Sequence, residues 1–210
     1  MSGTLHHLQL PVDEARVRSL VVGDLVMLSG DITVSIGLPT HKRMAEDLAA
    51  GRPLPLDLSG GAFFHLSTYI RDAGRQGDAP QALYMNPSTS TRYNQYMPTI
   101  IRSQGLRLVG GKGGLDAASV QAMQEAGCAY LSFLGGGCTL LSRAIRGVVS
   151  SHWNEYISQF RLVTLRVEDL GPATVAIDAH GNSVYDNLLR SAMSRLSGIQ
   201  HQMKLHREGN

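Results

Sequence analysis

Two short segments of the chain concentrate side chains that bind anions. The first, residues 86–93, reads Asn-Pro-Ser-Thr-Ser-Thr-Arg-Tyr. The adjacent hydroxyls of Ser88, Thr89 and Ser90 are short hydrogen-bond donors. Arg92 adds a planar guanidinium whose fork of N–H groups matches a carboxylate in a two-point contact. The segment therefore predicts a site for a carboxylate or another small oxyanion.

The second segment, residues 110–114, reads Gly-Gly-Lys-Gly-Gly and carries another cation. Lys112 supplies a point charge, while Gly111 and Gly113 allow backbone N–H groups to approach a ligand closely. A simpler interpretation of the hydroxyl cluster is an N-cap for a helix that begins near Arg92. The two interpretations are compatible, because a helix N-terminus is itself an anion site.

Further segments in the same order give the chain a family resemblance. Besides the two anion-binding segments, the matching stretches are residues 22–30, 41–43, 55–65, 152–155, 171–172 and 177–182. With these stretches the chain resembles the iron–sulfur hydro-lyases, and more narrowly the β subunits of L-tartrate dehydratase and the C-terminal domains of class I fumarase. The resemblance extends over nearly the whole chain, from about Val22 to about Asn187.

The resemblance implies an activity and a set of site residues. Enzymes of this kind add or remove water across a carbon–carbon double bond of a small hydroxy acid, so a hydro-lyase subunit is expected. The catalytic residues implied are Ser88, Thr89 and Lys112. The substrate-binding residues implied are Arg92, Ser90, Gly111 and Gly113. A hydroxyl that acts as a base needs a nearby cation to lower its pKa, and Lys112 is expected to supply that charge.

The cysteine content bears on the implied cofactor. The hydro-lyases hold a [4Fe–4S] cluster with three cysteines, which leaves one iron open to the substrate. This chain has two, Cys128 and Cys138, without the CxxC spacing of a metal site. Small buried apolar side chains are the simpler interpretation of both. The resemblance therefore implies that a cluster-bearing α subunit holds the cofactor, in an α2β2 assembly.

One departure from the family pattern concerns a substrate arginine. The family carries an arginine in the loop before its His-Lys/Arg-Arg helix start, whereas this chain has Ile36 or Gly37 there. Loss of one partner of a desolvated arginine–carboxylate pair costs roughly 2–5 kcal/mol of binding. Two alternatives therefore stay open. One is a non-catalytic carboxylate-binding or regulatory module that kept the fold, and the other is a stand-alone binder of a sugar acid or phosphate.

The composition excludes several other classes of protein. The chain has 210 residues, of which 43% are hydrophobic and 17% charged, enough for one substantial core. Its formal net charge is only +2, with scattered Lys and Arg, so a nucleic-acid footprint is missing. Apolar runs are far shorter than the roughly 20 residues of a membrane span. No signal peptide is visible, so the cytoplasm is the expected location.

The hydrophobic pattern predicts an α/β fold. Strands are expected at residues 20–22, 25–28, 32–34, 62–70, 82–85, 106–109, 129–134, 160–168 and 173–178. Helices are expected at residues 40–50, 92–104, 116–126 and 182–196. Alternation of these elements around the anion-binding segments predicts a mixed sheet with a parallel βαβα core, and ligands at the carboxyl ends of its strands. The resemblance refines this expectation to a swivelling β/β/α domain.

One domain is expected at residues 19–198. An N-terminal extension, residues 1–18, is expected to precede it. A polar tail, residues 199–210, is expected after Gly198 ends the last helix. Residues 72–78, which are rich in charge, are expected to form an exposed loop.

Three smaller features have structural interpretations. The glycine-rich residues 135–138 predict a tight strand-to-helix turn, because they do not complete a dinucleotide-binding motif. Thr40 is expected to cap the helix that follows it. His41 and His65 fall where the family has histidines, and a cap or a core hydrogen bond is a commoner use of such residues than catalysis.

Overall fold

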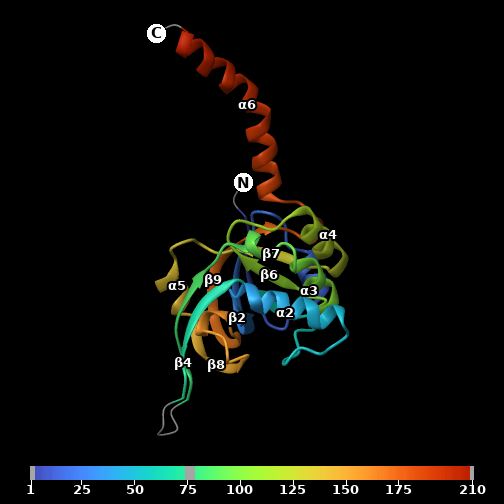
Figure 1. The fold of residues 1–210 in the computed structure, drawn as a ribbon, viewed down its shortest axis with the longest axis vertical. Helices are drawn as coiled ribbons and strands as arrows, with labels where there is room; N and C mark the ends of the chain where they lie inside the picture. Colours follow the sequence, from blue (N-terminus) through green and yellow to red (C-terminus); the bar gives the residue numbers. More distant parts are fainter. Residues whose placement is uncertain (1–2, 74–78, 209–210) are drawn as a thin grey trace.

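The computed structural model describes residues 3–73 and 79–208 and confirms a mixed α/β fold (Figure 1). Its strands are β1 (Leu5–Gln9), β2 (Leu25–Val34), β3 (Ala62–Phe64), β4 (Leu66–Arg71), β5 (Gln81–Pro87), β6 (Leu108–Gly111), β7 (Ala129–Ser132), β8 (Ile145–His152) and β9 (Leu162–Ile177). Its helices are α1 (Glu14–Arg18), α2 (Leu38–Ala49), α3 (Met97–Gln104), α4 (Ala117–Ala126), α5 (Cys138–Ser142) and α6 (Val184–Glu208), with short 3₁₀ turns η1 (Ser90–Tyr93) and η2 (Ser158–Phe160).

The main sheet closes on itself. Its strand order is β1-β2-β3-β6-β7-β9-β8, and an additional pairing joins β2 to β9. β3, β6 and β7 are parallel to one another, whereas β9 is antiparallel to both β7 and β2. The predicted parallel core is therefore confirmed for β6 and β7, and their carboxyl ends meet at one end of the ring.

Side-chain alternation along these strands divides the core into two hydrophobic clusters. Phe64, Leu108 and Leu131 belong to the cluster inside the ring of strands. Their neighbours Val109 and Tyr130 point the other way, into the cluster shared with the helices. Such a period of two is what β-strands impose. Both faces of the parallel strands are consequently buried.

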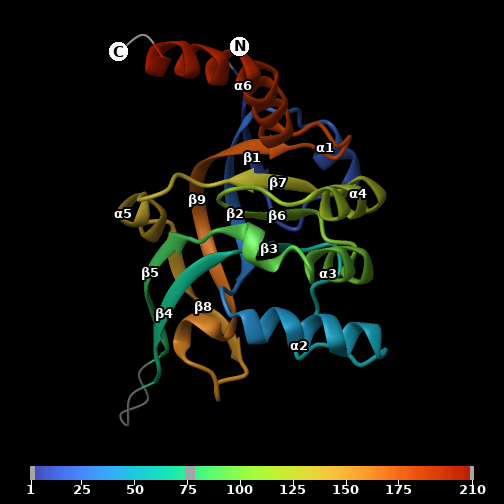
Figure 2. The ribbon, with the colours of Figure 1, turned by 45° about the horizontal axis from the view of Figure 1, so that its top comes forward.

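Three helices cover the outer face of the parallel strands, and α2, α3 and α4 stack along one side in Figure 2. α4 begins at an Asp116 cap, whose carboxylate accepts from Ser119 N at 3.0 Å, and ends at Gly127 in a left-handed conformation. Pro98 lies in the first turn of α3, so it restarts the helix after η1. Thr40 is inside α2, not at its cap, because the helix already begins after Gly37.

A second, smaller sheet pairs β4 with β5 in an antiparallel ribbon. The predicted strand over residues 62–70 is therefore two strands in different sheets, and the chain changes sheet at His65. β5 likewise lies outside the parallel core. Both strands nevertheless deliver their ends to the same place, since Ser88 N donates to His65 O at 2.8 Å.

Several predicted boundaries were wrong. Residues 20–22 are not a strand, because α1 precedes them and Leu20 packs into the core from the turn that follows. β1 lies within the expected N-terminal extension and pairs with β2 in parallel. β9 continues through Gly171 and Pro172, where register shifts in its pairing with β2 absorb the irregularity.

The last helix is longer than predicted. α6 continues through Gly198 to Glu208, into the segment expected to be a tail. A single glycine costs a helix interior only about 1 kcal/mol, so it does not have to end one. Among the described residues no helix combines the length and apolar content that crossing a bilayer requires. Most of the loop expected at residues 72–78 lies outside the described part of the chain.

Candidate active site

Three backbone segments meet at the carboxyl ends of β3, β5 and β6. His65 N donates to Gly110 O at 2.7 Å, which joins the end of β3 to β6. Lys112 N donates to Ser88 O at 2.9 Å, and Ser90 N donates back to Lys112 O at 2.8 Å. The structure therefore brings together the two anion-binding segments that lie some twenty residues apart in the sequence. Their shared place is the strand end at which α/β proteins bind ligands.

Gly111 permits this close approach. A Cβ atom at this position would collide with Ser90 Oγ and would lie 2.9 Å from Ser88 O and 3.1 Å from the Cβ of His65. The next glycines have another purpose, since Gly113 and Gly114 have φ of 83° and 78°, a region that favours glycine. The first role of these glycines is therefore structural, because they allow the two segments to pack against each other.

The side chains of the two segments differ in exposure. Arg92 and Lys112 are exposed, Thr89 is half-buried, and Ser88 is buried. Arg92 Nη1 lies 3.5 Å from Ser88 Oγ, so the guanidinium is beside the hydroxyl turn. Ser90 is completely buried. Its predicted contact with a substrate stays a prediction, and its hydroxyl is directed into the protein.

A buried chain of hydrogen bonds supports the turn from within. Ser90 Oγ lies 2.7 Å from Nδ1 of His65 and 2.8 Å from the hydroxyl of Tyr130. The backbone N–H of Gly114 donates to the same Tyr130 hydroxyl at 3.3 Å. Burial raises the pKa of Tyr130 well above its usual range, so the phenol keeps its proton. These hydrogen bonds attach both anion-binding segments to strand β7.

Two histidines lie beneath the turn, and both are fully buried. His41 stacks on the ring of Tyr93 with centroids 3.9 Å apart, and its Nδ1 lies 2.7 Å from Gly37 O. Burial lowers the pKa of His41 to about 4. Burial, with a smaller contribution from His41, lowers the pKa of His65 well below its ordinary value. Both imidazoles are therefore neutral at pH 7, and their burial supports the structural interpretation.

The side chains of Arg92 and Lys112 line two different cavities. Arg92 lines a cavity of about 460 Å³ together with Ile36, Leu38, Tyr93 and Phe160. Lys112 lines another, of about 510 Å³, whose other members include Gly113, Ser132 and Tyr185. The turn at Ser88 contacts both sides, through the guanidinium of Arg92 and the backbone of Lys112. A small anion that spans this turn would be within the field of both charges.

The position of the absent family arginine is at the first of these hollows. Ile36 is half-buried in the cavity that Arg92 lines. Gly37 has no room for a side chain, because a Cβ there would lie 2.7 Å from the Cβ of Phe160 and would collide with Thr40 Oγ1. Arg43 does not replace the charge, since Nη1 binds Glu155 at 2.7 Å and its guanidinium stacks 4.5 Å above Trp153.

The glycine-rich turn after β7 is confirmed as a strand-to-helix connection, because α5 begins directly after Gly137. It also approaches the site, since a Cβ at Gly135 would lie 4.0 Å from Cδ of Lys112. Tyr130 was missed by sequence reasoning, which placed it in a buried strand. A tyrosine in such a strand must find a partner for its hydroxyl, and that requirement is the signal that could have identified it.

The residues of this chain do not fit an iron–sulfur cluster. A cluster ligand is a thiolate. Cys128 is completely buried, and its burial raises the pKa of the thiol well above the usual range. Within the described residues no group of three or more His, Cys, Asp or Glu side chains could hold a metal ion.

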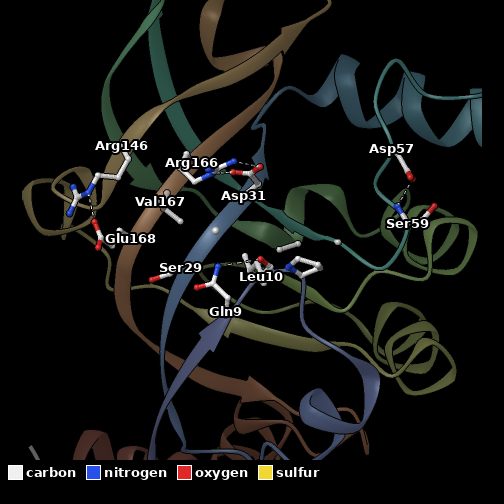
Figure 3. Close-up of a pocket in the computed structure, with 14 residues that line it drawn as sticks. Gln9, Leu10, Ser29, Asp31, Asp57, Ser59, Arg146, Arg166, Val167 and Glu168 are labelled. Carbon is white, nitrogen blue, oxygen red and sulfur yellow. Dashed lines mark hydrogen bonds and ion pairs between the residues drawn. The ribbon is translucent and has the colours of Figure 1, made fainter.

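A larger cavity than these two lies elsewhere, at the amino end of β3. It measures about 650 Å³ and is lined in part by Gly61 and Ala62. Figure 3 labels other members of its lining, among them Asp31, Asp57 and Arg166. Its arginines already have carboxylate partners, since Arg166 Nη2 lies 2.9 Å from Asp31 and Arg146 Nε lies 2.7 Å from Glu168. None of the predicted site residues lines it. Volume is a weaker guide than chemistry here, so we assign the site to the Ser88 turn.

Fold and site together define an α/β domain that presents a hydroxyl-rich turn flanked by Arg92 and Lys112 at its strand ends. The chain belongs to the fumarase C-terminus family, whose model matches residues 4–188, and this confirms the resemblance. It is 29% identical over 177 residues to the L(+)-tartrate dehydratase subunit beta of Escherichia coli (strain K12), covering 84% of this chain and 85% of that protein.

Two further relatives show the breadth of the family. The putative L(+)-tartrate dehydratase subunit beta of Methanocaldococcus jannaschii is 28% identical over 184 residues, or 87% of this chain and 92% of that protein. The putative fumarate hydratase class I of Geobacillus stearothermophilus is 31% identical over 191 residues. That match covers 90% of this chain but 35% of the longer relative, so the chain is similar to one part of that protein.

Proposed function

We propose that this chain is the β subunit of a [4Fe–4S]-dependent hydro-lyase that reversibly dehydrates a small 2-hydroxy carboxylic acid. One observation carries the proposal. The exposed guanidinium of Arg92 lies 3.5 Å from Ser88 Oγ, on a turn that is hydrogen-bonded to the backbone of Lys112. In a member of the fumarase C-terminus family, that arrangement is the substrate side of the active site. We also propose that the domain is of the swivelling β/β/α type.

Each side chain has a role that its surroundings support. Arg92 binds a substrate carboxylate in a two-point contact, because its guanidinium is exposed beside the hydroxyl turn. Lys112 neutralises the charge that develops on the carboxylate as a neighbouring C–H proton is removed. Ser88 or Thr89 orients the substrate. One of them, ionised because a nearby cation lowers the pKa of its hydroxyl, accepts that proton while the C–O bond breaks and the substrate hydroxyl leaves as water or hydroxide. Gly111 and Gly113 let the backbone approach the ligand, and Ser90 holds the turn in place.

The proposal includes a partner. We place the [4Fe–4S] cluster on an α subunit, because this chain has two cysteines, fewer than the cluster needs, and one of them, Cys128, is buried. We expect the two kinds of subunit to form an α2β2 assembly in the cytoplasm. The relatives from Escherichia coli and Methanocaldococcus jannaschii are named as beta subunits, which supports this division. No nucleic acid or membrane takes part. The two hollows beside Ser88 would then be closed by the α subunit.

The pocket of Arg92 also suggests a substrate preference. Ile36, Leu38 and Phe160 give it apolar walls where the family has a second arginine. We expect the reconstituted complex to prefer 2-hydroxy acids whose distal end is uncharged or esterified. The measurement compares kcat/KM for L-tartrate, malate and fumarate with that for monocarboxylate 2-hydroxy acids. A tenfold preference for the four-carbon dicarboxylates, or about 1.4 kcal/mol, would refute the altered specificity.

The alternative is a non-catalytic carboxylate-binding or regulatory module. The same apolar replacement at Ile36 favours it, because such a module has no need of the second arginine. Anaerobic co-expression with a candidate α subunit, followed by a screen of hydroxy acids, separates the two. Dehydration that requires both chains supports the enzyme. Binding of a hydroxy acid by a complex that never turns it over supports the module.

A further inference from the structure

The C-terminal helix α6 leaves the body of the protein after its first turn. Its start is anchored, since Val184 and Tyr185 pack against the core and Tyr185 OH donates to Ser132 Oγ at 3.2 Å. From Asp186 onward the described side chains are exposed. Figure 1 shows the helix standing away from the rest of the fold, and Figure 2 shows that it changes direction along its length.

This exposed helix carries an apolar stripe. Among its described residues, the large exposed hydrophobic side chains are Leu188, Leu189, Met193, Leu196, Ile199 and Met203, which are 43–63% exposed. With Tyr185 and Ala192, the stripe recurs at alternating intervals of four and three residues, at positions 185, 189, 192, 196, 199 and 203. That spacing averages 3.5 residues, which is the repeat that keeps one seam facing a partner helix in a coiled coil.

The stripe is not part of the surface that the family shares. The family match ends at residue 188, two residues after the side chains of the helix become exposed. A contact that all the β subunits make with an α subunit would lie within the matched residues. The occupant of the stripe must therefore be specific to this chain, and the most direct candidate is a second copy, which brings an identical stripe.

We propose that α6 pairs with α6 of a second copy of this chain, in an antiparallel two-stranded coiled coil. One observation selects the antiparallel direction. Tyr185, at the base of the stripe, is covered by its own body, so a parallel partner would bring a second body to the same place. The antiparallel register that matches stripe to stripe sets Leu196 opposite Ile199 of the second copy, and Ala192 opposite Met203.

Charge agrees with this register. At the edge of the antiparallel seam, Asp186 near the start of one helix faces Arg207 near the end of the other, twice over by symmetry. Arg195 faces Gln202, so two like charges do not meet there. The helix dipoles are also opposed, which favours antiparallel neighbours. In this arrangement the two bodies lie at opposite ends of the helix pair.

The test uses the full-length chain in sedimentation equilibrium. We expect a concentration-dependent dimer, and Leu196→Asp and Ile199→Asp should each raise the dissociation constant at least tenfold. Ser194→Asp and Ser197→Asp add the same charge to the opposite face and should leave it unchanged. Because these positions are exposed on α6, far-ultraviolet circular dichroism should show the fold retained in all four variants.

Disulfide trapping tests the direction. In a Cys138→Ser background, chains with Leu189→Cys and chains with His206→Cys should cross-link to each other when mixed. Self-linking of Leu189→Cys chains at the expense of the mixed product would overturn the antiparallel pairing. A monomeric wild-type chain would overturn the proposal. The proposal would also be overturned if the chain were a monomer and Leu196→Asp abolished its binding to the α subunit or to anionic lipid vesicles. In that case the stripe would bind one of those partners and not a second copy.

Discussion

The turn at Ser88 and the helix α6 are built in opposite ways. At the turn, Ser90 and His65 are fully buried, and backbone hydrogen bonds join each strand end to the next. Along α6 the large apolar side chains beyond residue 188 whose placement is described are exposed. The first region lies within the family match and the second beyond it. The contrast indicates that the domain shared with the family holds its candidate site residues by close packing, whereas the exposed part of α6 offers an apolar surface to a second copy of the chain.

The largest effect should come from the two exposed cations of the turn. Arg92→Lys and Lys112→Met should each lower kcat/KM of the reconstituted complex by at least about 100-fold, the loss typical of removing one preorganised charge from an active site. Both side chains are exposed, so the melting temperature should hardly change. Lys42→Met, on the exposed face of α2, is the matched control and should retain activity. Near-wild-type kinetics in either site variant would show that the site lies elsewhere.

Substituting one glycine at the Ser88 turn and one in α6 compares how tightly the two regions are packed. Gly111→Ala should destabilise the protein by about 1–3 kcal/mol, because the new Cβ has no space beside Ser90 and Ser88. Gly198→Ala in α6 meets nothing within 4 Å and should be neutral or stabilising by up to about 1 kcal/mol. Chemical denaturation of the two variants measures both values. Equal stability of the two would contradict the packing described at the turn.

The buried histidines should give the packed region a pH dependence. Burial lowers the pKa of His41 from 6.5 to about 4, so between these values the unfolded chain binds more protons than the folded one. Stability should therefore rise with pH across this window and be lost on acidification, by about 1.4 kcal/mol per pH unit for each such histidine. His41→Gln should flatten the slope, and His201→Gln on exposed α6 should not. An unchanged slope in His41→Gln would count against this assignment.

Part of this arrangement was predictable from the sequence. Ser88, Arg92 and Lys112 each follow a predicted strand, so local pattern places them near strand ends. Their proximity was not predictable in the same way, because β5 and β6 lie in different sheets and the two segments meet through hydrogen bonds between Ser88 and Lys112. The contact of Ser90 with His65 and Tyr130 was not predictable, because it depends on the register of β6 against β7 and on where the chain changes sheet. Gly198 misled the prediction of α6, since its flanking residues sustain the helix.

The central claim is that this chain supplies the substrate side of an active site whose cluster belongs to a partner. Iron content and hydroxy-acid dehydration should therefore be measured on the anaerobically reconstituted single chain and on its complex with the α subunit. We predict no bound iron and no activity for the single chain, and both for the complex. A stoichiometric cluster in the single chain would contradict the account.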